Sequence, residues 1–271
     1  MAEKKKKIIF YSALLSCSAA VVLRCLQFFM QTDLQTGHLK SGSTALSAVI
    51  LVLAAGAVLL SFFVEAREGA AALSPRKNSS SKLFMLLSGA ALFYDFVRQC
   101  LNVYNYFSKN SYVKWNYIIP LALFGLLALA SALYFAALAF LSGSSGYDFK
   151  RVHILHYLPL FWAVFGLLTS LTVLEDLRDV QQAVYKTAAL IFATLFFAAY
   201  AAAFSQPRLY KRMVPGFGLS YSFAAAIYSV PELLGLIFGV YHLNSVYFAG
   251  TFLLTGAFAF AASCDLIAEK Q

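Results

Sequence analysis

Two ionisable residues three positions apart, Asp95 and Arg98, lie deep within a long apolar stretch of the chain. At 1.5 Å per residue, Asp95 lies about 18 Å along a helix from Leu83, just past the middle of a membrane. A lone charge at that depth costs about 2.5–3.5 kcal/mol on insertion scales. Their spacing puts both groups on one helix face, where they can neutralise each other. One interpretation is a self-contained ion pair that fixes helix packing. The other is a binding or proton-relay site, which Gln99 and Asn102 on the same face favour.

A second candidate site is the segment Ser229–Glu232, inside another apolar run. Serine followed three residues later by glutamate, with Pro231 between them, is typical of a helix start. Proline removes a backbone donor, so the segment predicts either a kink or a broken helix. A broken helix would begin its second half in mid-membrane, with its positive amino end beside Glu232, as in many transporter sites. Gly235 and Gly239 follow at the GxxxG spacing of close-packed membrane helices.

A third polar face lies in the first apolar run, where Arg24 and Gln27 are three residues apart. Arg24 lies about 24 Å into that run, near the outer interface. Its guanidinium group either reaches water along its stem or meets Asp95 or Glu232 across the bundle. In the second case Arg24 and Arg98 would balance the two carboxylates, a condition that buried charge clusters tend to satisfy.

These residues require long helices that hold them in a membrane. The chain has 271 residues, 61% hydrophobic and 12% charged, whereas a soluble domain carries about 25% charged residues. A helical span needs about 20 apolar residues, and barrel strands are only about 10 residues long with alternating polarity. Eight stretches have the length and composition of helical spans: 8–30, 44–64, 83–103, 117–141, 152–174, 183–204, 214–240 and 246–264. Residues 1–271 are therefore predicted to form a single all-α membrane domain.

The basic residues between the spans fall on alternate sides. Fourteen lie on the side of the amino terminus: Lys4, Lys5, Lys6, Lys7, Arg67, Arg76, Lys77, Lys82, Lys150, Arg151, Arg208, Lys211, Arg212 and Lys270. Four lie on the other side: Lys40, Lys109, Lys114 and Arg178. Because Lys and Arg accumulate in cytoplasmic loops, this bias predicts both termini in the cytoplasm, four helical hairpins and residence in the cell membrane. The same dispersal argues against a nucleic-acid partner and leaves membrane lipids as the predicted surroundings.

The even-numbered spans are almost purely apolar and rich in small residues. The stripes Ala128, Ala132, Ala136 and Thr255, Ala259, Ser263 recur every four residues, a pattern typical of closely packed membrane helices. We interpret these stripes as packing surfaces. Lys186, close to the outer end of the sixth span, is expected to reach water.

No catalytic residue, metal site or cofactor is predicted. His153 and His156 have a spacing that can chelate a metal, but no further ligand pattern accompanies them. No Gly-x-Ser-x-Gly, His-Glu-x-x-His, Walker or Cys-x-x-Cys motif occurs.

The polarity pattern predicts an outward-facing polar cavity lined by the odd-numbered spans. The leading hypothesis is that this cavity binds or translocates a small polar or ionic solute. Its candidate ligand-binding residues are Asp95, Arg98, Gln99, Asn102, Glu232, Arg24, Gln27 and Ser229. One alternative is an intramembrane enzyme acting on a lipid-linked substrate, with Asp95 or Glu232 as general base. Another is a non-catalytic subunit of a transporter or sensor complex, bound to a membrane-protein partner.

Overall fold

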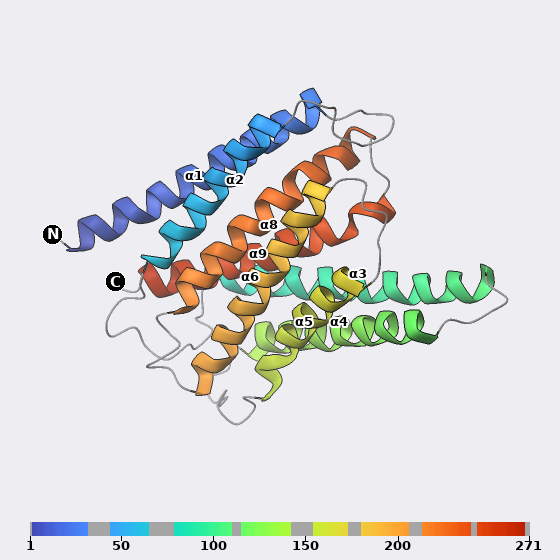
Figure 1. Cartoon of the computed structure of the whole chain (residues 1–271). Coiled ribbons are helices and arrows are strands. Elements are labelled where there is room, and N and C mark those ends of the chain that lie inside the picture. Colours follow the sequence, from blue (N-terminus) through green and yellow to red (C-terminus); the bar gives the residue numbers. More distant parts are fainter. Residues whose placement is uncertain are drawn as a thin grey trace.

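The computed structural model describes residues 2–31, 44–64, 79–109, 115–141, 154–172, 180–205, 213–239 and 243–268. Within these ranges the regular elements are helices: α1 (Ala2–Gln31), α2 (Thr44–Phe62), α3 (Ser79–Lys109), α4 (Trp115–Leu141), α5 (Leu158–Thr172), α6 (Val180–Ser205), α8 (Met213–Ile237) and α9 (Leu243–Ala268) (Figure 1). Seven helices are long and apolar enough to cross a membrane, and a shorter apolar segment is Ile154–Ser170. The chain therefore has the architecture of an all-α, multi-pass membrane protein.

Each predicted span overlaps one of these helices, but the bounds differ. Helix α3 runs six residues beyond the predicted end of its span, because Tyr104–Lys109 continue the helix past the apolar core. Helix α5 begins at Leu158, later than predicted, and a short 3₁₀ segment at Ile154–Tyr157 precedes it. Polar and aromatic residues extend a helix into the interface without changing its hydrogen bonding, so apolarity alone misplaces such ends.

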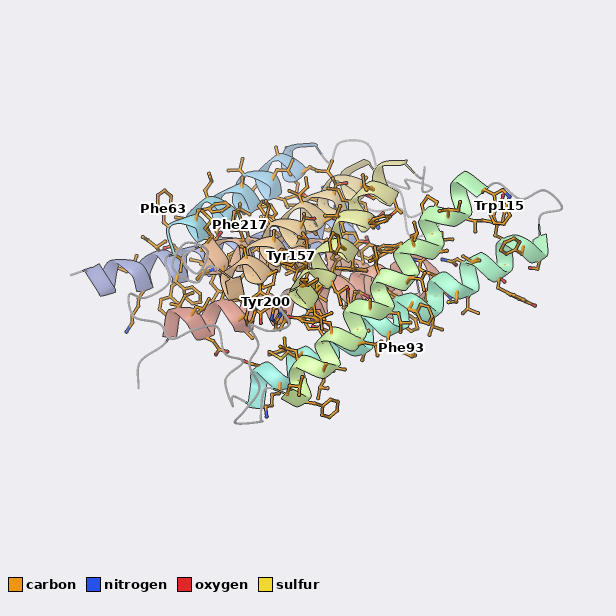
Figure 2. The ribbon with its side chains drawn as sticks, turned by 90° about the horizontal axis from the view of Figure 1, so that it is seen from below. Phe63, Phe93, Trp115, Tyr157, Tyr200 and Phe217 are labelled. Carbon is orange, nitrogen blue, oxygen red and sulfur yellow. The ribbon has the colours of Figure 1, made fainter. Side chains whose placement is uncertain are left out.

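Helix α8 lies at the centre of the arrangement. It packs against α9, α6, α2 and α1, while α3 packs against α4 and α9, and α5 packs against α4 and α6. Helices α8, α9, α3, α4, α5 and α6 therefore close a ring. The pair α1–α2 and the pair α3–α4 lie on opposite sides of α8–α9 (Figures 1 and 2).

The sides of the bundle carry large apolar residues, and the interior carries tightly packed aromatic rings. Figure 2 shows Phe93 and Trp115 at the periphery of the α3–α4 pair, where they are 52% and 61% exposed. Tyr200 of α6 is buried, and its ring lies 5.6 Å from that of Phe258 on α9. Large apolar side chains can remain exposed on the outside of the bundle, because lipid tails are as apolar as these side chains.

Small residues bring α8 and α9 into close contact. Ser222 Oγ donates a hydrogen bond of 2.8 Å to the carbonyl of Gly256 across this interface. A Cβ atom at Gly256 would lie 2.8 Å from Cβ of Ala225, and one at Gly218 would clash with Ser263. The predicted small-residue stripe of the last span therefore does pack against a neighbouring helix.

Helices α3 and α4 approach each other in the same way. A Cβ atom at Gly89 would lie 3.2 Å from the carbonyl oxygen of Ala132, and one at Gly125 would lie 3.0 Å from Cβ of Gln99. The alanine stripe of the fourth span contributes Ala128 and Ala132 to this buried surface.

Helices α3 and α9 run antiparallel, joined by three polar contacts at successive depths. Near the start of α3, Ser81 Oγ donates a hydrogen bond of 2.6 Å to Asp265 Oδ2 near the end of α9. Deeper in the bundle, Thr251 of α9 donates to Asp95 of α3. Between them, Ser88 Oγ donates a 3.1 Å hydrogen bond to the carbonyl of Leu254.

Helix α8 is continuous through Pro231, so the broken-helix alternative is wrong and Ser229 is not a helix cap. Most of the helix is buried, and packing on four neighbours keeps it helical despite the donor that proline lacks. The helix ends at Ile237, and a turn follows to Gly239, whose φ of 71° is the left-handed conformation that glycine adopts after helix ends. Nothing lies within 4 Å of a Cβ placed there, so the predicted packing face does not extend to Gly239.

We expect Gly256→Val to destabilise the α8–α9 contact, because the added side chain would overlap Ala225. Overpacking of this kind costs about 1–3 kcal/mol. Thermal unfolding of the purified protein in detergent should therefore show a lower midpoint. The matched control is Gly250→Val on the same helix, where a Cβ meets open space and the midpoint should change little. Equal midpoints for the two variants would contradict this packing.

Candidate polar site within the bundle

The carboxyl group of Asp95 is the most deeply enclosed charge-bearing group of α3. Its side chain is fully buried, and Thr251 Oγ1 donates a hydrogen bond of 2.9 Å to Oδ1. Its second oxygen, Oδ2, accepts no hydrogen bond from the described residues. Asp95 thus takes its hydrogen-bond donor from α9 and keeps one oxygen available to another group.

Two further hydroxyl groups extend the contact from α9 to α8. Thr255 Oγ1 donates a hydrogen bond of 2.6 Å to the carbonyl of Thr251, one turn earlier. The hydroxyl of Tyr221 lies 2.6 Å from Thr255 Oγ1. Since the Thr255 hydrogen is directed to the carbonyl, Tyr221 is the donor in this pair. The hydroxyls therefore connect α3, α9 and α8 at one position in the bundle.

Lys186 of α6 brings a positive charge to the same place. Its Nζ lies 4.7 Å from the ring centroid of Phe248 on α9, within the range of a cation–π interaction. Phe248 is three residues from Thr251, so the two side chains share a face of α9. The ammonium group also interacts electrostatically with Asp95. Lys186 is half-exposed, so the expectation that it reaches water remains a prediction, while its ammonium group lies against an aromatic face.

Arg24 of α1 also points into the bundle. It is only 8% exposed, and its Nη1 donates a hydrogen bond of 2.7 Å to Gln27 Oε1. Gln27 in turn donates through Nε2 to Ser47 Oγ of α2, at 2.7 Å. The guanidinium carbon lies 5.1 Å from the ring centroid of Tyr185, the residue before Lys186. Arg24 is therefore buried within the bundle, and it contacts the helix that carries Lys186.

Helix α8 carries two further residues that the sequence predicted for the site, Ser229 and Glu232. Ser229 is fully buried and Glu232 is 4% exposed. Ser229 Oγ makes no hydrogen bond with the described residues. Helices α1 and α8 pack against each other, and the rings of Phe29 and Phe238 lie 5.0 Å apart. Arg24 lies five residues before Phe29 and Glu232 lies six before Phe238, so these two charged residues are at a similar height.

The part of the α3 face that follows Asp95 is directed toward α4. Gln99 is 2% exposed and lies against Gly125 of α4. Asn102 Nδ2 lies 3.4 Å from Gln99 Oε1, a long hydrogen bond, and Asn102 and Arg98 are both half-buried. The structure thus places Gln99 in the α3–α4 contact, whereas Asp95 is bound at α9.

Sequence analysis did not select Thr251, Tyr221, Tyr185 or Ser47. Hydroxyl groups in apolar helices are common, and Thr251 and Thr255 resemble the small-residue stripe that packs on α8. A usable signal was present in Lys186, an ionisable residue within a span, which insertion cost makes a default candidate for function.

The described residues contain no group of three or more His, Cys, Asp or Glu side chains that could hold a metal ion. His156 Nδ1 lies 2.7 Å from the hydroxyl of Tyr134, and its ring stacks on Phe204 at 3.8 Å. His153, its predicted partner in chelation, lies outside the described residues. His156 is therefore held by aromatic packing and one hydrogen bond.

No family model matches this chain, and no curated protein or solved structure matches it either. The geometry described above is accordingly the basis for any functional assignment.

We expect Thr251→Val to destabilise the protein, because it leaves Asp95 Oδ1 buried without the hydroxyl donor shown here. An unsatisfied buried acceptor costs about 1–3 kcal/mol. Thr251→Ser, which keeps the hydroxyl, is the control and should unfold near the wild-type midpoint. In a double-mutant cycle, Thr251→Val should cost much less in an Asp95→Leu background. Equal losses in both backgrounds would show that this hydrogen bond contributes nothing.

Proposed function

We propose that this protein binds a small polar or ionic solute at the buried site around Asp95 and moves it across the membrane. The supporting observation is the fully buried Asp95 carboxyl group, with one oxygen held by Thr251 and the other without a hydrogen bond among the described residues. Burial of an ionisable group within a span is costly and marks substrate or ion pathways. A purely structural role would favour pairing both oxygens.

The surrounding residues provide complementary charges for such a solute. Lys186 lies near Asp95 and against Phe248. Arg24 of α1 and Glu232 of α8 are buried at a similar height to each other, and Arg24 contacts the residue before Lys186. In this proposal Asp95 and Glu232 contact cations or protons, while Arg24 and Lys186 offset them or bind an anionic group. These buried charges must be neutralised both with and without the solute, because an uncompensated buried charge is strongly destabilising.

The orientation of the chain belongs to the same proposal. We infer that both termini are cytoplasmic, that the eight helices form four hairpins and that the membrane is the cell membrane. The bias of Lys and Arg toward one side supports this orientation. It puts Asp95 in the outer half of α3 and the Ser81–Asp265 hydrogen bond near the cytoplasmic face.

Binding should depend on the carboxylates of the site. We expect a ligand to raise the thermal midpoint of the purified protein, since a ligand that binds only the folded state stabilises it. The panel would include sodium and potassium chloride, amino acids, sugars and small amines. Asp95→Asn should abolish the shift. Glu232→Gln should weaken the affinity for the ligand by about tenfold and so give a smaller shift at the same ligand concentration. Asp265→Asn, which alters a carboxyl group at the other end of α9, is the matched control.

If every shift seen in wild type survives Asp95→Asn, the proposal fails. A lipid product formed by wild type and not by Asp95→Asn would instead favour an intramembrane enzyme. A stoichiometric membrane-protein partner that co-purifies with the chain would favour a non-catalytic subunit.

The proposed orientation predicts which loops are accessible from outside. In a variant whose four cysteines are replaced by serine, we expect Lys40→Cys to react in intact cells with a membrane-impermeant maleimide. Lys77→Cys should react only after the membrane is opened, because it lies in a cytoplasmic linker in this topology. Labelling of position 77 in intact cells would overturn the orientation.

A further inference from the structure

Five aromatic side chains from four helices surround one turn of α9. Phe248 stacks against Phe124 of α4 at 5.6 Å and against Phe252 at 5.9 Å. Trp162 of α5 stacks against Phe124 at 6.2 Å and contacts Phe252 at 6.1 Å. Tyr228 of α8 meets Phe252 edge-on at 5.6 Å. We call these five residues the aromatic cluster.

A primary ammonium group already lies on this cluster. Lys186 Nζ is 4.7 Å from the ring centroid of Phe248, with its butyl stem reaching in from α6. Aromatic faces attract ammonium groups through the ring quadrupole, and the attraction strengthens when water is excluded. Three residues further along α9, Thr251 holds the carboxyl group of Asp95. An anion and aromatic faces together form the usual recognition site for an organic cation.

Three buried polar atoms make no hydrogen bond among the described residues and belong to residues that are in the aromatic cluster, next to it in sequence, or bound to a neighbour of it. They are Asp95 Oδ2, Trp162 Nε1 and Ser229 Oγ, and all three side chains are fully buried. Trp162 belongs to the cluster, Ser229 follows Tyr228 on α8, and Asp95 is bound to the residue before Phe252. Buried polar groups are normally satisfied, so these three atoms on residues associated with the cluster support a place for a ligand.

We propose that the site takes an organic cation with an alkylammonium group, and that Lys186 is an internal ammonium that the ligand displaces from Phe248. This inference rests on the proposed function and names its substrate class. The ligand ammonium lies on the face of Phe248 and neutralises Asp95, while Trp162 and Ser229 offer hydrogen bonds to its polar substituents. Alkali and alkaline-earth ions are poorer candidates, because hard cations prefer a shell of oxygen ligands and this site offers mainly rings.

Trp162 provides a direct reporter for this binding. The chain has two tryptophans, and the other, Trp115, is 61% exposed at the start of α4. In a Trp115→Phe background we expect n-butylammonium to change the Trp162 fluorescence saturably, and the uncharged 1-butanol to give no saturable change. Asp95→Asn should abolish the response to n-butylammonium.

Substitutions of the ring and of the internal ammonium test the two parts separately. Phe248→Leu, which removes the aromatic face and keeps an apolar side chain, should weaken n-butylammonium binding by about tenfold. Lys186→Met, which removes the competing charge at similar volume, should strengthen it by about tenfold. Lys7→Met, at an exposed position of α1, is the control and should leave the affinity unchanged.

Two results would overturn this inference. One is an equal response to n-butylammonium and 1-butanol, which would indicate simple partitioning into apolar space. The other is a Lys186→Met variant that is folded, as judged by its elution and thermal midpoint, and binds n-butylammonium no more tightly than wild type. If another solute shows Asp95-dependent binding while n-butylammonium does not, the substrate class is wrong and the proposed function stands. If no solute does, the proposed function itself fails.

Discussion

The position of the Asp95 carboxyl group in an apolar bundle is the constraint on which the other features of the site depend. A charge-bearing side chain inside a span needs a polar partner, because an unpaired charge in hydrocarbon is costly. Here Thr251 of α9 provides that partner and Tyr221 of α8 extends the contact through Thr255. Glycines and small residues between α8 and α9 let the backbones come close enough for these hydroxyls to meet.

Much of the fold follows from composition, and less of the site does. Long apolar runs allow only helices in lipid, so the number and approximate limits of the helices could be predicted. The alanine stripe of the fourth span and the small-residue stripe of the last one could also be assigned to packing surfaces, because lipid gives helices no other strong reason to associate.

The pairing of side chains across helices could not be predicted, since it depends on which helices are neighbours. Asp95 and Arg98 share a face by their spacing, yet the hydrogen-bond donor of Asp95 comes from α9, which follows α3 by more than 130 residues. The contact of Lys186 with Phe248 likewise depends on which residues of α9 face α6. The continuity of α8 through Pro231 reflects packing on four helices, which no local pattern contains.

The polar contacts between α3 and α9 have one more consequence. Ser81 and Asp95 are separated by the same number of residues as Thr251 and Asp265, so both hydrogen bonds form in a single antiparallel register. At 1.5 Å per residue these contacts are about 21 Å apart. A slip of one helical turn would break both at once, so the two contacts together favour a single register of α3 against α9. The carboxyl group of Asp95 therefore keeps its position along α9 for as long as both contacts hold.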